Sequence, residues 1–398
     1  MTRLVLTSSP VTLEERYGRF VSAASTEPSF GLVCLAAAAR DAGADVRIVE
    51  AASNDLTPET AAQEILRWAP EIVGISATTA GIVAAGQLAA MLKASSPSLL
   101  IVVGGCHASA LPEETLREFP AFDLLACGEG ERTLTEILRR HVPGSPPPRG
   151  LAGTAERDGD RIRCHAPAAL IGNLDELPLP AWDLLDGFPT RFRPSLARIR
   201  RRPCASVVLT RGCPNQCTFC DRSVFGRRCR SYSPAYAVRL IRDLVDNFGV
   251  RELLIEDDTF IILKDHIREL CERLIADRID LSWSCLGRAD RVDPELLRLM
   301  RQAGCWHISY GIESGSPAIL KAVHKNLDLE QIRQAAAWSR EAGLQTKGFF
   351  MVGFPNETRG TLDETRRFAL SLPLDDITVM QLTPFPGSEL YRDAAQYG

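Results

Sequence analysis

The sequence predicts an α/β protein, in which a doubly wound parallel sheet of the Rossmann type is followed by a partial (β/α)6 barrel. Strand-like segments alternate with helical segments along two long stretches, and many of the strand-like segments are continuous apolar runs. Such runs are typical of parallel strands that helices cover on both faces. A proline-rich stretch separates the two series. We therefore expect a first domain over residues 1–142, a linking region over 143–203 and a barrel over 204–398.

Composition limits the classes of protein to which this chain can belong. Its 398 residues suffice for two or three domains. The net charge of −4 gives no basic footprint, so we expect no nucleic-acid partner. No apolar run of about 18 residues occurs, so we expect no membrane span. The twelve cysteines form no disulfide-like framework. That pattern favours a reducing compartment, and we expect a cytoplasmic protein.

The first domain is expected to alternate strands and helices. The expected strands are 3–7, 46–49, 72–76, 99–103 and 124–126, and the expected helices are 30–42, 58–68, 81–94, 112–118 and 131–141. Residues 8–29 are expected to form a loop. Ligands of such sheets bind at the carboxyl ends of the strands. Gly104 and Gly105 follow one strand there and would let a bulky ligand approach the backbone, although a tight turn without a ligand is the alternative.

The linking region begins with the proline-rich segment 143–150. Residues 151–164 predict a small hairpin, because Asp158 and Gly159 form a turn signal. An extended strap is expected over 177–185. The arginine-rich segment 191–202 fits a solvated face better than a contact with an anionic cofactor.

The barrel is predicted by six strand-like segments with helices between them. The expected strands are 206–210, 252–256, 282–286, 306–312, 345–352 and 376–382, and the expected helices are 234–248, 265–277, 294–303, 328–342 and 360–371. In β/α barrels the chemistry lies at the carboxyl ends of the strands. Candidate functional residues are therefore sought where each strand ends.

Three cysteines follow the first barrel strand with the spacing C-x3-C-x2-C: Cys213, Cys217 and Cys220. Three thiolates on one tight loop can hold three irons of a [4Fe-4S] cluster. The fourth iron then keeps an open site, as a catalytic metal does. A zinc knuckle is the alternative, but it usually needs a second pair of ligands, and Cys229 stands alone.

This cysteine segment resembles the signature of the radical S-adenosylmethionine (SAM) superfamily, including Phe219 before the last cysteine. The resemblance implies that SAM binds the open iron and that Phe219 lies in the cofactor site. One electron then cleaves SAM to methionine and a 5′-deoxyadenosyl radical, which abstracts a hydrogen atom from an unactivated carbon. The expected partners are a small-molecule substrate and an electron donor such as flavodoxin or ferredoxin.

The ends of the later barrel strands supply the remaining cofactor candidates. The resemblance implies that Glu256 and Asp257 contact the SAM amino group, that Glu313 and Ser314 contact SAM and its ribose, and that Gly353 lies against the adenine. Arg288 fits the SAM carboxylate, because a guanidinium can bind a carboxylate with two hydrogen bonds. A surface arginine is the alternative reading for Arg288.

Catalytic candidates come from the fourth barrel strand. Its period of two places His307, Ser309 and Glu313 on one face, which we expect to line the barrel interior. We include Tyr310 as a third catalytic candidate beside His307 and Ser309, although the alternation places it on the opposite, apolar face. A hydrogen-bonded core histidine is the alternative for His307.

The first domain resembles the cobalamin-binding domain that precedes many radical SAM barrels. The resemblance rests on Gly104, Gly105, Cys106 and His107 after a strand and on the segment 127–131. The sequence departs from the best-known cobalamin domains, because it lacks D-x-H-x-x-G and residues 8–29 contain no histidine. The domain therefore binds cobalamin without a histidine ligand or does not bind it.

The leading hypothesis is a radical SAM enzyme that uses cobalamin to methylate an unactivated carbon of a small metabolite. The alternative is a cobalamin-independent dehydration, deoxygenation or rearrangement, for example of an aminoglycoside-like sugar. A tRNA methylthiotransferase is disfavoured, because the chain has no basic RNA-binding tail. A non-catalytic cofactor-binding protein is disfavoured by the complete six-strand series.

Overall fold

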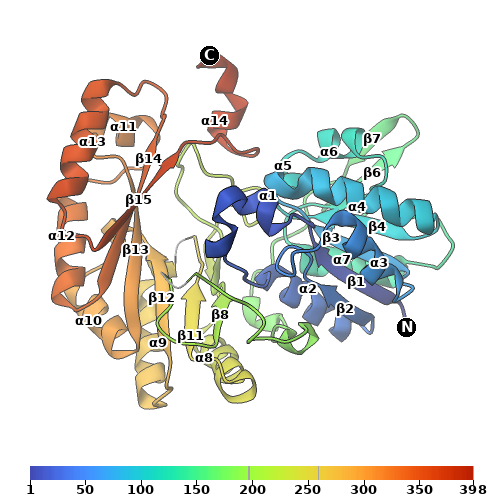
Figure 1. Ribbon diagram of the computed structural model, residues 1–398, viewed down its shortest axis with the longest axis horizontal. Helices are drawn as coiled ribbons and strands as arrows, with labels where there is room; N and C mark the ends of the chain where they lie inside the picture. Colours follow the sequence, from blue (N-terminus) through green and yellow to red (C-terminus); the bar gives the residue numbers. More distant parts are fainter. Residues whose placement is uncertain (196–197, 259, 398) are drawn as a thin grey trace. The chain divides into compact units, whose positions relative to one another are not determined.

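The computed structural model describes residues 1–195, 198–258 and 260–397. The chain divides into two compact units. The first comprises Met1–Gly172, Glu176–Ser195 and Ser223–Phe225, and the second comprises Asn173–Asp175, Leu196–Arg222 and Gly226–Gly398. Each unit is built around its own sheet (Figure 1).

The first unit contains a seven-stranded sheet with the order β2-β1-β3-β4-β5-β6-β7. Its strands are β1 (Arg3–Ser8), β2 (Asp45–Val49), β3 (Ile72–Ser76), β4 (Leu100–Gly104), β5 (Leu124–Ala126), β6 (Thr154–Asp158) and β7 (Arg161–Cys164). The strands from β2 to β5 pair in parallel, whereas β6 and β7 pair antiparallel. This is the doubly wound sheet that the sequence predicts.

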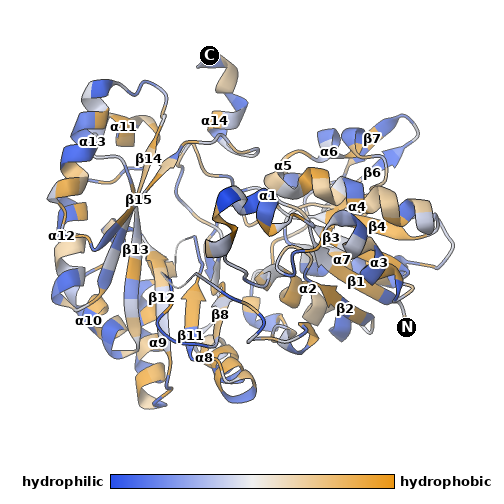
Figure 2. Cartoon of the chain, in the orientation of Figure 1, coloured by the Kyte–Doolittle hydropathy of each residue, from blue (hydrophilic) through white to orange (hydrophobic). Residues whose placement is uncertain are grey.

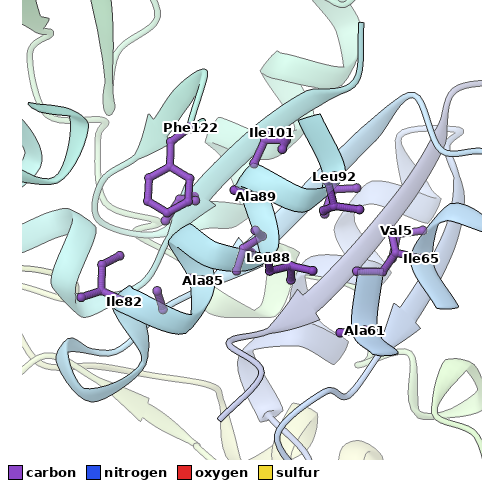
Figure 3. Close-up of a cluster of buried hydrophobic side chains, with 14 of the residues drawn as sticks. Val5, Ala61, Ile65, Ile82, Ala85, Leu88, Ala89, Leu92, Ile101 and Phe122 are labelled. Carbon is purple, nitrogen blue, oxygen red and sulfur yellow. The ribbon is translucent and has the colours of Figure 1, made fainter. Parts of the chain in front are cut away.

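Helices complete the first unit: α2 (Phe30–Asp41), α3 (Pro58–Leu66), α4 (Ile82–Ser95), α5 (Cys106–Ala110), α6 (Pro112–Glu118) and α7 (Gly130–Arg140). The core between the sheet and the α3–α4 pair is apolar, and Figure 3 shows Ile65 and Leu88 facing the strand residues Val5 and Ile101. Burying such side chains stabilises the fold by roughly 25 cal/mol per Å² of apolar surface. The continuous apolar strands of the sequence are explained by this burial.

Two segments of the first unit differ from the prediction. Residues 8–29 hold a short helix, α1 (Leu13–Tyr17), which begins with a capping box between Thr12 and Glu15. The predicted hairpin is present as β6 and β7, but it extends the sheet of the first unit instead of standing in a separate linker. The Arg157 guanidinium fixes it by donating to the carbonyl oxygens of Leu116, Phe119 and Phe122.

The second unit contains a six-stranded parallel sheet with the order β15-β14-β13-β12-β11-β8. Its strands are β8 (Cys204–Val207), β11 (Glu252–Ile255), β12 (Ser282–Gly287), β13 (Cys305–Glu313), β14 (Gln345–Val352) and β15 (Asp376–Gln381). Its principal helices are α8 (Pro234–Arg242), α9 (Lys264–Ala276), α10 (Pro294–Gln302), α12 (Leu329–Glu341) and α13 (Arg359–Ser371), and they lie along one face of the sheet (Figure 1). This is the partial (β/α)6 barrel.

The first barrel strand is shorter than predicted. It ends at Val207, and a second short strand, β9 (Thr210–Arg211), pairs with β10 (Arg230–Ser231) across the cysteine segment. An extra helix, α11 (Pro317–Ala322), follows β13, and α14 (Glu389–Arg392) lies near the end of the chain. Apolar residues, orange in Figure 2, concentrate in the strands of both sheets. No helix of the described residues is long and apolar enough to span a membrane.

Candidate functional site

The three predicted cluster cysteines lie on a loop between β9 and β10 whose backbone is held from several directions. The Thr218 amide donates to the Val323 carbonyl oxygen at 3.1 Å, and the Thr218 carbonyl accepts from the Leu390 amide at 2.9 Å. The Cys213 amide donates to the Gly226 carbonyl oxygen at 3.3 Å. The loop is therefore fixed by backbone contacts that do not involve its thiols.

The thiols of this loop have an environment that suits metal ligation. A hydrogen bond with Cys220 lowers the pKa of the Cys217 thiol to about 6, and the positive charges of Lys325 and Arg288 act in the same direction. The same contact raises the pKa of the Cys220 thiol. Among the described residues, no three histidine, cysteine, aspartate or glutamate side chains lie close enough together to hold one metal ion. A four-iron cluster takes each thiolate on a different iron, so its ligands need not converge, and the thiolate at Cys217 is the form that binds iron.

Glu313 and Arg288 lie on either side of a buried lysine that sequence reasoning missed. Lys325 Nζ contacts Glu313 Oε1 at 2.8 Å, and both side chains are more than nine-tenths buried. Arg288 donates to the Lys325 carbonyl oxygen at 3.1 Å and to Asp290 Oδ1 at 3.0 Å. Lys325 follows α11 and not a strand, so the rule of strand ends could not identify it. The structure therefore brings two predicted SAM-binding residues together through a third residue.

Phe219 connects this group to the cysteine loop. Its ring centroid lies 5.9 Å from that of Phe354 and 6.0 Å from Lys325 Nζ. It packs against a small buried cluster formed by Ile319, Val323 and Phe354. The aromatic residue of the cysteine motif thus joins the loop to the elements that follow β13 and β14.

The two acids at the end of β11 have different surroundings. Glu256 forms an ion pair with Arg198 and is partly exposed. Asp257 is fully buried, and its Oδ1 accepts a hydrogen bond from the Leu209 amide at 2.8 Å. Burial raises the pKa of Asp257 to about 7. Asp257 thus holds the segment between β8 and β9 against the end of β11, whereas Glu256 is paired with Arg198 and stays partly exposed.

Ser314 and Gly353 also differ in how far a ligand could reach them. The Ser314 hydroxyl lies 2.9 Å from Thr365 Oγ1 of α13 and accepts from the Ser316 amide, so its hydrogen bonds are internal. Gly353 has a φ of +93°, and a Cβ built there would approach nothing closer than Leu382, at 3.9 Å. The backbone at Gly353 is open to the close approach of a flat ligand.

The catalytic candidates of β13 lie on opposite sides of the sheet. His307 and Ser309 share the face from which Lys347 projects, because Ser309 pairs with Lys347 in the register. Burial, assisted by the charge of Lys347, lowers the pKa of His307 to about 4, so the ring is neutral at pH 7. Tyr310 is fully buried, and its hydroxyl lies 2.8 Å from Ser339 Oγ of α12. Tyr310 therefore packs against α12 and does not face the side of the sheet that carries His307 and Ser309, which speaks against a catalytic role.

In the first unit, the two candidate glycines lie at the carboxyl end of β4. Gly105 has a φ of +102°, and a Cβ there would lie 2.5 Å from the Ala77 carbonyl oxygen. Tight packing accordingly explains Gly105 without a ligand. A Cβ at Gly104 would lie 3.3 Å from the Ala126 carbonyl oxygen. His107 Nδ1 lies 3.2 Å from Thr79 Oγ1, which gives this ring a hydrogen-bond partner within the unit.

A buried acid that the sequence did not reveal lies at the same edge of the first sheet. Glu50 follows β2, and its carboxylate accepts hydrogen bonds from the Ser29 amide at 2.6 Å and from Ser8 Oγ at 3.1 Å. The residue is 3% exposed. Burial raises the pKa of Glu50 from 4.5 to about 7, and the two hydrogen bonds oppose this shift. Glu50 thus joins β1, β2 and the start of α2 with a carboxyl group that titrates near neutral pH.

Substituting Glu50 with glutamine is expected to remove a pH dependence of stability. The folded carboxyl keeps its proton up to a pKa of about 7, whereas the unfolded one loses it near 4.5. The stability that it contributes is therefore full below pH 4.5 and is lost as the pH rises through 7, by about 3 kcal/mol at most. Urea unfolding at pH 5 and pH 8 measures the difference. Glu64→Gln, at an exposed position, is the control and should show the same change in the free energy of unfolding between pH 5 and pH 8 as the wild type. The same change in Glu50→Gln as in the wild type would contradict the prediction.

Comparison with known protein families gives two matches. Residues 207–369 match the radical SAM superfamily, and residues 18–138 match the B12 binding domain. The first match contains the cysteine loop together with Arg288, Glu313, Lys325 and Gly353. The second contains β2, β3, β4 and β5 of the first sheet together with Gly104 and Gly105, whereas β1 precedes it.

Relatives and solved structures agree with both matches. An uncharacterized methyltransferase of Pyrococcus horikoshii is 33% identical over 378 residues, which are 93% of this chain and 79% of that protein. The anaerobic magnesium-protoporphyrin IX monomethyl ester cyclase of Cereibacter sphaeroides is 30% identical, and the match covers 93% of this chain and 61% of the cyclase. The radical SAM methyltransferase TsrM of Kitasatospora setae, solved with cobalamin and a [4Fe-4S] cluster, has the same fold with a TM-score of 0.79 at 19% identity, covering 100% of this chain and 75% of TsrM.

Proposed function

Because the chain belongs to the radical SAM superfamily, in the group that carries a B12 binding domain before the barrel, we propose that it methylates an unactivated carbon of a small molecule. The chain is a radical SAM enzyme, and its cofactors are a [4Fe-4S] cluster, SAM and cobalamin. The observation that carries the proposal is the match over 93% of the chain to a relative named as a methyltransferase. When bound, the cluster and SAM supply a hydrogen-abstracting radical, and cobalamin supplies a carrier for the methyl group.

Within this proposal, different residues of the second unit bind the cluster and SAM. Cys213, Cys217 and Cys220 hold three irons. Glu313 and Arg288, both more than nine-tenths buried, orient the charged groups of SAM. Gly353 leaves its backbone open to the adenine. This division is supported by the contacts that link Phe219, Lys325 and Arg288 to the loop.

The proposal assigns the substrate to the sheet face that carries His307 and Ser309. His307 is neutral at pH 7, so it can accept or donate a hydrogen bond there without adding a charge. Ser309 of β13 pairs with Lys347 of β14, and Lys347 pairs with Asp376 of β15. Lys347 and Asp376 also form an ion pair at 2.7 Å. We propose further that a flavodoxin- or ferredoxin-like protein donates the electron and that the enzyme works in the cytoplasm, where a reducing environment preserves an iron–sulfur site.

Retention of cobalamin is the experiment that tests methyl transfer. Anaerobic protein reconstituted with hydroxocobalamin and desalted is expected to keep about one cobalamin per chain. The Co(II) form should show no nitrogen splitting from an axial histidine in its paramagnetic resonance spectrum, because residues 8–29 contain no histidine. His107→Ala is the matched control and should leave retention and spectrum unchanged, since this ring is paired with Thr79.

Two outcomes of that experiment would change the conclusion. Retained cobalamin with nitrogen splitting that comes from a histidine would contradict the histidine-free site but keep methylation. No retention would reject methylation by this route. The cobalamin-independent dehydration, deoxygenation or rearrangement would then become the favoured reaction.

A further inference from the structure

Lys325 is a buried lysine to which the proposed function gives no role. It is 7% exposed, and burying a lysine is costly unless its charge is paired. Its Nζ contacts Glu313 Oε1 at 2.8 Å and lies 6.0 Å from the centroid of the Phe219 ring. Its backbone carbonyl accepts from Arg288. One residue thus contacts the cysteine motif and two of the residues assigned to SAM.

The chain adopts an unfavourable local conformation to form this ion pair. Glu313 has a φ of +68°, which is uncommon for a residue with a side chain, and the register between β13 and β14 shifts there. A Cβ at Gly311 would lie 2.6 Å from Glu313 Oε1 and 3.0 Å from Lys325 Nζ. A side chain at position 311 would therefore displace the pair from this arrangement. Because a buried ion pair by itself is weak support for stability, the arrangement calls for a functional explanation.

We propose that Lys325 is a positioning residue that holds Glu313 and Phe219 beside the cysteine loop and raises the reduction potential of the cluster bound there. The proposal rests on ligation by Cys213, Cys217 and Cys220. One-electron reduction adds negative charge to a site that already carries three thiolates. A nearby ammonium in a water-poor site stabilises the reduced form. Lys325 Nζ lies 6.0 Å from the ring centroid of Phe219, the residue that directly precedes Cys220, so its charge is close to the cysteine loop.

This electrostatic arrangement predicts shifts of opposite sign for the two partners of the ion pair. Lys325→Met removes the cation and leaves the Glu313 carboxylate, so the cluster becomes harder to reduce. Glu313→Gln leaves the cation unopposed, so the cluster becomes easier to reduce. The double variant should return towards the wild-type potential, and Lys325→Arg should preserve it.

The test is a dye-mediated redox titration of the anaerobic, iron-loaded protein, without SAM or substrate, followed by paramagnetic resonance. Lys325→Met is expected to lower the reduction equilibrium constant at least tenfold, or about 59 mV for a one-electron couple. Lys321→Met is the matched control, because Lys321 lies four residues earlier and is exposed. It should titrate as wild type does.

Several results would overturn the proposal. A fully iron-loaded Lys325→Met that titrates like Lys321→Met would reject it, as would shifts of the same sign in Lys325→Met and Glu313→Gln. If Lys325→Met fails to hold iron, Glu313→Gln decides, because a potential that does not rise rejects the electrostatic role. Failure of the cysteine assignment is distinguishable, since iron would then remain after the three cysteines are replaced.

Discussion

Replacing Cys213, Cys217 and Cys220 together with alanine is expected to abolish the iron content and the brown chromophore of anaerobically purified protein. Thiolates are the ligands of iron–sulfur clusters, and this loop carries three of them on eight consecutive residues. The fold should survive, because the loop is fixed by backbone bonds from Thr218 to Val323 and Leu390. Iron analysis, the absorption spectrum and far-ultraviolet circular dichroism measure the three quantities.

Cys229 provides the matched control for this experiment. It lies nine residues after Cys220 but outside the motif, so Cys229→Ala should keep the full iron content. A triple variant that retains its iron would show that other ligands hold the metal. Loss of iron from Cys229→Ala alone would show that the three-cysteine assignment is incomplete.

Arg288→Ala is expected to slow the cleavage of SAM by roughly 10- to 100-fold in the absence of substrate. Hydrogen bonds to charged groups contribute about 1.5–3 kcal/mol, which corresponds to this range. Arg288 is 8% exposed and fixed by Asp290 and the Lys325 carbonyl, so its guanidinium is held in one orientation. Glu313→Gln should slow the same reaction. The measurement is uncoupled formation of 5′-deoxyadenosine under excess chemical reductant.

Arg291→Ala is the control for Arg288→Ala. Arg291 also contacts Asp290, at 3.6 Å, but its side chain is 43% exposed. It should cleave SAM at the wild-type rate. Iron content must be equal in all variants, so that loss of the cluster is not mistaken for loss of SAM orientation. Wild-type rates in both Arg288→Ala and Glu313→Gln would remove these residues from the SAM site.

Local patterns in the sequence were sufficient to predict both sheets and the cysteine loop. The apolar runs that became β3 and β4 need only their own composition to indicate buried parallel strands. The spacing of Cys213, Cys217 and Cys220 is likewise a property of one short segment. The alternation in β13 also correctly separated Ser309 from Tyr310, and the contact of Tyr310 with Ser339 gives the reason to drop its catalytic role.

Only the tertiary structure identified the residues whose importance comes from distant neighbours. Lys325 is twelve residues from Glu313 in the chain, and nothing in its own segment indicates that the two charges meet in a buried site. Burial in the folded chain raises the pKa of Glu50 to about 7, although hydrogen bonds from Ser8 and Ser29, in two other segments, oppose the shift. Periodicity and motif spacing report which way a side chain points and which ligands lie on one loop. Burial and charge pairing depend on segments far apart in the sequence, and folding alone decides them.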